Sequence, residues 1–314
     1  MLITGCTGFL GSWLSNSLVK AEAIVIGLVR GGNLVNSHLF RLGCQKQMNL
    51  VYGRVEDFKT LLRVMSEHEV DTVFHLAAQA IVGKASQDSL ATFETNIKGT
   101  WNVLEAARRT PSVKRVLVAS SDKVYGTCDV LPCVETTPLQ AIYPYDVSKS
   151  CVEHLCACYV HSFNLPVSIT RCGNVFGGGD LNYNRLIPGT IYSLFKGNSP
   201  VIRSEGSSIR DYLYVEDGVE AYLCLAEKME ELKLSGEAFN FSLGSPVSAK
   251  QLVQQIIELM DSQLKPVILS ETSKEIQNMF LSSQKAKKIL GWQPKHSLDQ
   301  GLRKTIQWYR EFLS

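Results

Sequence analysis

Tyr145 and Lys149 are the residues whose types and spacing best suit acid–base chemistry. They stand four positions apart in the segment PYDVSK, residues 144–149. On a helix this spacing brings both side chains to one face. Because a nearby ammonium lowers the pKa of a phenol, the pair predicts that Tyr145 acts as a base near neutral pH.

A second polar group follows the apolar run 115–119, in the segment SSDKVYG at residues 120–126. Its Ser121, Asp122 and Lys123 supply a hydroxyl, a carboxyl and an amine where a strand is expected to end. The alternative is a surface turn in which Lys123 is solvated and Asp122 caps a backbone amide.

Three glycines near the start of the chain form a turn suited to a dinucleotide. Gly5, Gly8 and Gly11 lie in TGCTGFLG, between an apolar strand and an amphipathic stretch that begins with Phe9 and Leu10. Such a turn lets a pyrophosphate approach backbone amides at a helix N-terminus. A bound nicotinamide would add a positive charge that helps to lower the pKa of Tyr145.

Short β-branched runs alternate with amphipathic stretches along the first half of the chain, which is typical of βαβ units around a parallel sheet. We therefore predict an α/β fold, a Rossmann doubly wound parallel sheet with a smaller mixed α/β C-terminal substrate lobe. The first strand, at residues 2–4, is short, so we expect a truncated N-terminus. The expected strands are 2–4, 23–29, 72–76, 115–119 and 167–171, and the expected helices are 9–20, 89–109 and 145–163.

The composition changes after about residue 175 to Gly, Asn and Pro. We assign residues 1–175 to an NAD(P)-binding domain and 176–314 mainly to the substrate lobe. Part of 212–243 is expected to return to the Rossmann sheet.

The length, composition and net charge of the chain favour an enzyme that acts on small molecules. The 314 residues are 45% hydrophobic, and 32 basic against 30 acidic residues give a net charge of +2 without a charge block. We therefore expect no nucleic-acid or membrane partner, and no apolar run approaches the ~18 residues of a transmembrane helix. The odd number of cysteines, nine, and the lack of a secretory signal predict reduced thiols and a cytoplasmic location. The spacing of Cys151, Cys156 and Cys158 around His154 does not favour zinc, so no metal is expected.

Taken together, these segments resemble the extended short-chain dehydrogenases that modify nucleotide sugars. The resemblance covers nearly the whole chain, including HLAAQ at 75–79, ETNIKGT around Asn96, RCGNVFGGGD at 171–180, RDYLYVED at 210–217 and the closing LGWQP. It implies a nucleotide-sugar substrate, bound NAD or NADP, and a homodimer that pairs helices 89–109 and 145–163. The residues implied at the cofactor are Gly5, Gly8, Phe9, Leu10, Gly11, Arg30, Leu76, Ala77, Ala78, Asn96, Tyr145 and Lys149, and those implied at the substrate are Gln79, Asn174, Leu186 and Arg210.

Within this family the Asp–Lys pair of SSDKVYG is most similar to CDP-glucose 4,6-dehydratases. Oxidation at C4 of the hexose acidifies the C5 hydrogen, so water loss needs a base at C5 and an acid at the C6 hydroxyl. The resemblance implies that Asp122 is the acid and that Lys123 stands where related enzymes place a Glu base. A Lys can act as a base only if burial or nearby cations depress its pKa. Ser121 is expected to assist Tyr145.

At several positions the sequence differs from the family pattern, and these differences leave undetermined whether the cofactor is NAD or NADP and which nucleotide base the substrate carries. Arg30 follows the second strand where NAD enzymes carry an acidic residue, which favours NADP slightly. Arg54 stands where many relatives have an Asp, and RDYLYVED is closer to dTDP- and UDP-sugar enzymes.

His75 is interpreted as a hydrogen-bonded core histidine rather than a proton shuttle. Arg210 is either a diphosphate clamp or an ion-pair partner of Asp211.

Two other functions are compatible with parts of this pattern. A nucleotide-sugar epimerase needs the Tyr and the Lys but no acid for water loss, and Asp122 favours the dehydratase. A dinucleotide-sensing protein without turnover predicts loss of Tyr145 or Lys149, and both are present. The expected enzyme is an NAD(P)-dependent NDP-sugar 4,6-dehydratase, with CDP-glucose as the best candidate substrate and other GDP-, dTDP- or UDP-hexoses as alternatives.

Overall fold

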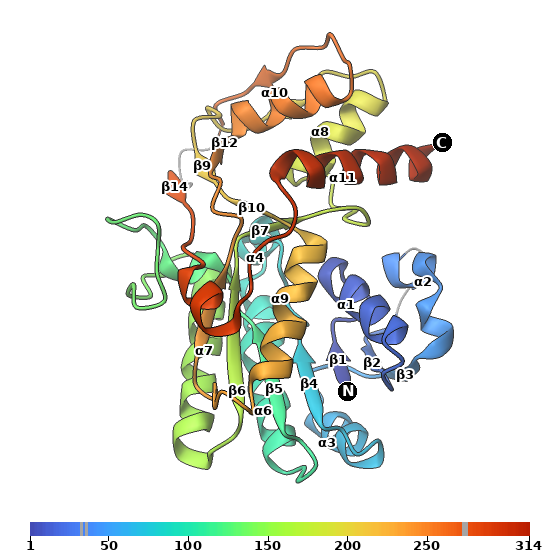
Figure 1. Ribbon diagram of the computed structural model, residues 1–314, viewed down its shortest axis with the longest axis vertical. Coiled ribbons are helices and arrows are strands. Elements are labelled where there is room, and N and C mark those ends of the chain that lie inside the picture. Colours follow the sequence, from blue (N-terminus) through green and yellow to red (C-terminus); the bar gives the residue numbers. More distant parts are fainter. Residues whose placement is uncertain (32–33, 35–36, 272–275) are drawn as a thin grey trace.

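The computed structural model describes residues 1–31, 34, 37–271 and 276–314. Its centre is a parallel sheet of seven strands in the order β11-β6-β5-β4-β1-β2-β3 (Figure 1). The chain reverses direction of winding between β1 and β4, which is where doubly wound sheets bind ligands. The predicted fold class is confirmed. The strands are β1 (Leu2–Thr4), β2 (Ile26–Val29), β3 (Asn49–Tyr52), β4 (Thr72–His75), β5 (Arg115–Ala119), β6 (Val167–Cys172) and β11 (Ala238–Phe241).

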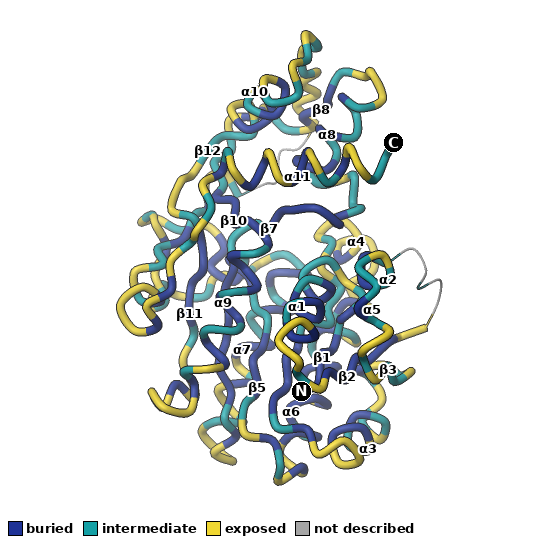
Figure 2. Tube along the Cα trace, turned by 45° about the vertical axis from the view of Figure 1, so that its right-hand side comes forward, coloured by how far each residue is buried: buried dark blue, intermediate teal, exposed yellow. Residues whose placement is uncertain are grey.

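Helices cover both faces of this sheet, so most of its strands are buried (Figure 2). One face carries α1 (Phe9–Lys20), α2 (His38–Leu42) and α9 (Val215–Lys228), and the other carries α3 (Phe58–Glu67), α6 (Gly99–Arg108) and α7 (Pro144–Phe163). Burial on both faces explains why these strands read as continuous apolar runs.

The strands 2–4 and 115–119 and the helix 9–20 have the bounds expected from the sequence. β2 begins at Ile26 rather than residue 23, because its first partner on β1 is Leu2. The expected single helix 89–109 is corrected. It consists of α5 (Ser89–Phe93), the π-helical turn η3 (Glu94–Lys98) and α6. The wider π turn redirects side chains locally, and it contains Asn96.

A smaller group of elements lies above the sheet in Figure 1 and has its own apolar core. Its helices are α8 (Leu186–Phe195), α10 (Ala249–Leu259) and α11 (Leu298–Leu313). Capping boxes start the last two, at Ser248 with Gln251 and at Ser297 with Gln300. Short strands complete this part, namely β7 (Asn174–Phe176) with β10 (Tyr212–Tyr214), β9 (Ile209–Arg210) with β12 (Val247–Ser248) and β14 (Asn278–Met279), and β8 (Val201–Ile202) with β13 (Val267–Ile268).

The cysteines differ from expectation at one place. Cys128 and Cys133 form a disulfide, so the prediction that all thiols are reduced is wrong for this pair. Cys128 and Cys133 are five residues apart, so the disulfide closes a short loop, and the number of cysteines in the sequence does not predict this contact.

Among the described residues no group of three or more His, Cys, Asp or Glu side chains could hold a metal ion. No described helix is long and apolar enough to cross a membrane.

Candidate active site

The glycine turn connects β1 to α1 and lies against the turn that follows β4. Gly5 has a left-handed backbone with φ of 77°, and a Cβ on it would lie 2.8 Å from the Ala77 nitrogen. A Cβ on Gly11 would lie 2.2 Å from the Gly5 oxygen. Gly8 precedes α1 and provides no side-chain cap, so the first N–H groups of the helix remain available to a phosphate. This cradle fits a dinucleotide.

A cavity of about 390 Å³ opens beside this turn. Two of its residues, Ser37 and His38, were missed by the sequence analysis, and no motif marks them. The Ser37 hydroxyl and both His38 ring nitrogens are buried without a hydrogen-bond partner among the described residues. Burial lowers the pKa of His38 to about 4, so the ring is neutral and can both donate to and accept from a ligand. The cavity is lined by Thr7, Phe9, Ser37, His38, Ile81, Lys84, Gly179, Asp180, Leu181 and Asn182.

Asn96 joins the loop after β4 to the start of α7. Its Oδ1 accepts the Gln79 backbone N–H at 2.7 Å, and its Nδ2 donates to the Ser148 hydroxyl at 2.8 Å. The π turn gives Asn96 this direction, and Leu76, Ala77 and Ala78 lie in the loop that it holds. Arg30 is exposed directly after β2, next to residues that lie outside the described part of the chain.

His75 is confirmed as a hydrogen-bonded core histidine. Its Nδ1 lies 2.7 Å from the Thr4 hydroxyl and its Nε2 lies 2.9 Å from the Thr100 hydroxyl. Burial, with the charge of Lys149, lowers the pKa of the ring to about 3. Both nitrogens are used, which leaves none for a proton shuttle.

The structure brings the predicted acid–base residues together. Ser121 precedes the short 3-10 turn η4 (Asp122–Tyr125), and Tyr145 and Lys149 lie in the first turns of α7, which packs against η4. The Ser121 hydroxyl donates to Asp122 Oδ1 at 2.9 Å and is hydrogen-bonded to the Tyr145 phenol.

Electrostatics at Tyr145 differ from the sequence-based expectation. Burial raises the pKa of the phenol to about 12; the hydrogen bond to Ser121 opposes this shift, and the charge of Asp122 adds to it. The Lys149 Nζ donates to the Ala119 carbonyl at 2.6 Å. Burial also lowers the pKa of Lys149, to about 8.

Lys123 has carboxylates rather than cations as neighbours. Its Nζ donates to Asp122 Oδ2 at 3.3 Å. The second carboxylate belongs to Asp146, which is 2% exposed, and its Oδ1 has no partner among the described residues. Burial raises the pKa of Asp146 to about 6, the charge of Lys123 opposes the shift, and Asp122 adds to it. The sequence analysis overlooked Asp146 although it directly follows Tyr145.

The residues predicted at the substrate are spread over a wider area. Leu186 begins α8, and the Asn174 side chain in β7 donates to the Asp211 carbonyl at 3.3 Å. Arg210 does not pair with Asp211; its guanidinium donates to the Ile209, Gln277 and Ile276 carbonyls at 2.8, 2.9 and 2.5 Å. Arg185, which was not predicted, is near enough to Tyr145 for its charge to lower the phenol pKa slightly.

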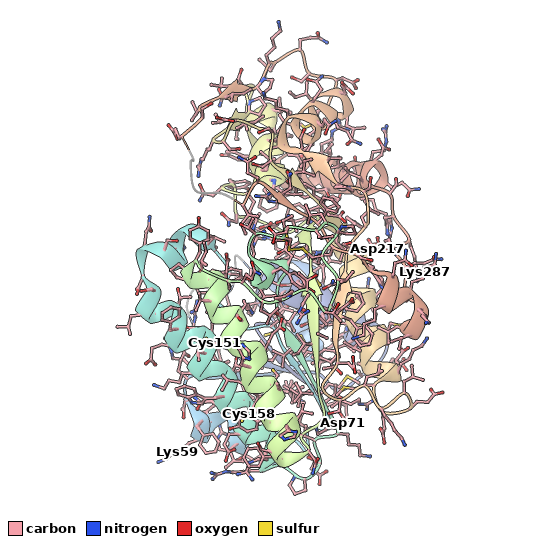
Figure 3. The ribbon with its side chains drawn as sticks, turned by 90° about the vertical axis from the view of Figure 1, so that its left-hand side faces the viewer. Lys59, Asp71, Cys151, Cys158, Asp217 and Lys287 are labelled. Carbon is pink, nitrogen blue, oxygen red and sulfur yellow. A yellow bond between two sulfur atoms is a disulfide. The ribbon has the colours of Figure 1, made fainter. Side chains whose placement is uncertain are left out.

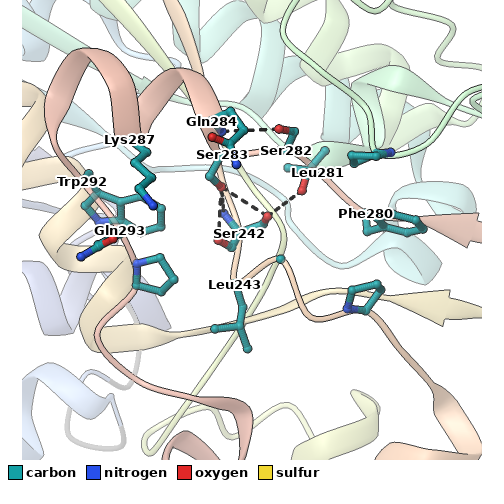
Figure 4. A pocket seen from close by; sticks show the side chains of 14 residues that line it. Ser242, Leu243, Phe280, Leu281, Ser282, Ser283, Gln284, Lys287, Trp292 and Gln293 are labelled. Carbon is teal, nitrogen blue, oxygen red and sulfur yellow. Dashed lines mark hydrogen bonds between the residues drawn. The ribbon is translucent and has the colours of Figure 1, made fainter.

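A second cavity, of about 400 Å³, lies between the segment after β11 and residues 280–294 (Figure 4). None of the residues predicted for cofactor or substrate lines it. The Ser242 hydroxyl donates to the Leu281 carbonyl at 2.9 Å, and the Ser242 N–H donates to the Ser283 hydroxyl at 2.8 Å. These bonds tie the segment before the π turn η5 (Ala286–Leu290) to the sheet.

Comparison with known proteins places the chain among nucleotide-sugar enzymes. It is 30% identical over 328 residues to the CDP-glucose 4,6-dehydratase of Salmonella typhimurium, covering 100% of this chain and 91% of that protein. It is 29% identical to a dTDP-glucose 4,6-dehydratase of Xanthomonas campestris, with 98% and 92% covered.

Two solved structures show the same fold over almost the whole chain. The UDP-glucose 4-epimerase of Thermotoga maritima superposes with a TM-score of 0.90 at 28% identity, covering 100% of this chain and 99% of that one. The dTDP-glucose 4,6-dehydratase of Streptomyces venezuelae, solved with NAD bound, gives 0.89 at 26% identity, with 99% and 96% covered. The predicted resemblance to extended short-chain dehydrogenases of the NDP-sugar 4,6-dehydratase branch is confirmed. A family model described as GDP-mannose 4,6 dehydratase matches residues 2–305, and the chain therefore belongs to that family.

Proposed function

We propose that the protein converts an NDP-hexose to the NDP-4-keto-6-deoxyhexose. The observation that carries this proposal is the contact between a base and an acid: Ser121 is hydrogen-bonded both to Tyr145 and to Asp122. Oxidation at C4 needs only the base, whereas loss of the C6 hydroxyl as water also needs the acid.

The residues present fit NAD or NADP. In the glycine turn Gly5 and Gly11 leave no room for a side chain, and a Cβ on Gly8 would lie 3.2 Å from the Gly5 oxygen, which suits the close approach of a pyrophosphate. Leu76, Ala77, Ala78 and Asn96 would hold the nicotinamide half together with Lys149, and Arg30 would face the adenosine ribose. When bound, the cofactor would supply the acceptor for the hydride from C4 and the donor of that hydride to C6.

The chain's own residues move the protons. Tyr145 takes the proton of the C4 hydroxyl, and Asp122 protonates the leaving C6 oxygen. Lys123 takes the C5 hydrogen, for which its amine must first be neutral. Asp122, at 3.3 Å, is the described acceptor for the ammonium proton, and one transfer makes Asp122 an acid and Lys123 a base.

The substrate assignment rests on the pair Asp122–Lys123 and on the similarity to a CDP-glucose 4,6-dehydratase. We infer that CDP-glucose is the best candidate, with dTDP-, UDP- and GDP-hexoses as alternatives, and that Gln79, Asn174, Leu186 and Arg210 contribute to its site. We also propose that residues 1–175 serve mainly the cofactor and 176–314 mainly the substrate, with part of 212–243 belonging to the sheet.

An epimerase is the second candidate, favoured by the TM-score of 0.90 to a UDP-glucose 4-epimerase. It needs Tyr145 but gives Asp122 no acid role. The two functions differ in the mass of the product, since only a dehydratase removes water.

The test is incubation with CDP-, dTDP-, GDP- and UDP-hexoses, each with NAD and with NADP, followed by mass spectrometry. We expect loss of one water from one nucleotide class, and no reaction in Tyr145→Phe. A product of unchanged mass with an inverted C4 in every active reaction would establish the epimerase instead.

A further inference from the structure

The His38 ring is held in place by the packing of two tryptophans and a glycine. His38 begins α2, and its ring centroid lies 5.5 Å from that of Trp13 in α1 and 5.5 Å from that of Trp308 in α11. A Cβ on Gly179 would lie 2.4 Å from the ring, so only a glycine leaves room for it. His38 is 4% exposed, yet neither ring nitrogen has a hydrogen-bond partner in the described part of the chain. Packing therefore fixes the direction of two nitrogens that remain available to a ligand.

Buried polar atoms without partners gather at this place. Exchanging water for no partner destabilises the folded chain. The Ser37 hydroxyl, next to His38, is also buried without a partner among the described residues. His75 is equally buried, but both of its nitrogens lie close to threonine hydroxyls, at 2.7 and 2.9 Å. Since Ser37 and His38 both line the cavity of about 390 Å³, a ligand in it can bind them.

The charges around this cavity favour an anionic ligand. Lys84 contributes an exposed ammonium to the lining. The Asp180 carboxylate, also in the lining, is already paired with Arg185 at 2.8 Å. Thr7 and Phe9 bring the start of α1 to the cavity, and the first turn of this helix carries no acidic residue. Because a helix N-terminus attracts negative charge, a phosphate suits this cavity.

A neutral imidazole can bind two different partners. Burial lowers the pKa of His38 to about 4, so at neutral pH one nitrogen carries a hydrogen and the other a lone pair. The first can donate to a phosphate oxygen, and the second can accept a hydrogen bond from a hydroxyl. A dinucleotide supplies both partners, because a hydroxyl-bearing ribose lies on each side of its diphosphate. The chemistry of the ring therefore matches a diphosphate joined to ribose.

We propose that His38, together with Ser37, binds the diphosphate and the adjoining ribose of the dinucleotide cofactor, and that Trp308 positions His38 for this contact. This inference rests on the proposed function, which requires NAD or NADP at the glycine turn. Trp308 belongs to α11, in the smaller group of elements above the sheet in Figure 1. The C-terminal helix thus contributes to cofactor binding through one aromatic contact.

His38→Phe separates ligand binding from packing. Phenylalanine keeps a ring between the two tryptophans and removes the unpaired nitrogens. We expect the urea midpoint of the cofactor-free variant to equal or exceed that of wild type. Calorimetric titration should show NAD and NADP binding weaker by at least about tenfold, as for the loss of a hydrogen bond to a charged group. His38→Gln keeps a donor and an acceptor and should recover most of the affinity, and Ser37→Ala, which adds no bulk, should weaken both cofactors.

His68→Phe is the matched control, because His68 is exposed after α3 and lines neither cavity. Its stability and cofactor affinity should equal those of wild type. Wild-type affinity in His38→Phe would overturn the assignment, and so would His38→Gln binding as weakly as His38→Phe. CDP is titrated as well, because a nucleotide sugar also carries a diphosphate; a loss confined to CDP would place His38 at the substrate and contradict the proposal. A wild type that binds neither NAD nor NADP would contradict the proposed function instead.

A double-mutant cycle tests the positioning role of Trp308. Trp308→Leu should weaken binding of the cofactor several-fold in wild type. It should have no further effect in His38→Phe, because the residue that Trp308 positions then makes no contact with the cofactor. Calorimetric titration of the four proteins, each shown to be folded by circular dichroism, gives the coupling. Losses that add in the double variant would show that Trp308 acts independently of His38 and would refute its positioning role.

Discussion

Arg171 in β6 and Glu153 in α7 form a buried bidentate ion pair directly beside the segment 120–125. The Arg171 Nε donates to one Glu153 oxygen at 2.9 Å and a terminal nitrogen donates to the other at 2.5 Å. Arg171 also donates to the Tyr125 hydroxyl at 2.7 Å, and Ser120 donates to Glu153 at 2.5 Å. The pair therefore fixes the ends of the segment that carries Ser121 and Asp122.

Removing one partner of this pair should destabilise the protein strongly. The side chains are 7% and 5% exposed, so Glu153→Gln leaves a buried guanidinium without its counter-ion. We expect a loss of about 3–5 kcal/mol in the free energy of unfolding. Urea denaturation measures it, with Arg63→Met as control, because the exposed pair Arg63–Glu67 contributes less than about 1 kcal/mol. Equal small losses in both variants would contradict the assignment.

Asp146→Asn should stabilise the protein in a manner that depends on pH. The folded-state pKa of Asp146 is raised to about 6 from 3.8, so ionisation costs stability. The cost is absent below pH 3.8, grows up to about pH 6 and is complete above it, where it reaches about 3 kcal/mol at most. The gain from Asp146→Asn should therefore be larger at pH 7 than at pH 4 in urea denaturation. A gain that is the same at both values would show that the charge is not its cause.

NADP should bind at least as tightly as NAD. Arg30 is exposed at the end of β2, where a guanidinium can meet a ribose 2′-phosphate. Calorimetric titration compares the two cofactors, and Arg30→Gln should weaken NADP alone, by about tenfold or 1.4 kcal/mol. Wild type binding NAD tenfold more tightly than NADP would reverse this prediction.

The protein is predicted to be a homodimer through α5, α6 and α7. Exposed apolar side chains lie on these helices, with Leu90 73% and Trp101 43% exposed. Cys151 and Cys158 follow one another along α7 in Figure 3, and Cys158 is exposed. Because a partner helix would cover this face, sedimentation at micromolar concentration should give a dimer.

Substitutions then locate the interface. Trp101→Glu should shift the sedimentation to that of a monomer, whereas Ile24→Glu should not, although Ile24 is 74% exposed before β2. A wild-type monomer, or equal behaviour of the two variants, contradicts an interface at α6.

The sequence by itself determined the turns, strands and helices whose conformation depends on neighbouring residues along the chain. The glycine turn, the strand 115–119 and the helix 9–20 follow from residue types and periodicity, which local backbone geometry translates directly into structure. The spacing of Tyr145 and Lys149 likewise placed both in the first turns of α7.

Only the tertiary structure decided the electrostatics and the contacts between distant segments. Burial, rather than Lys149, controls the pKa of Tyr145, and Asp146 becomes a titratable neighbour of Lys123 because α7 packs on η4. His38 reaches the cavity, and Arg210 is held by carbonyls instead of Asp211. The sequence does not show whether water or a packed helix surrounds the side chain of an aspartate or a histidine. Since desolvation sets its proton affinity, only the folded chain determines what it can do.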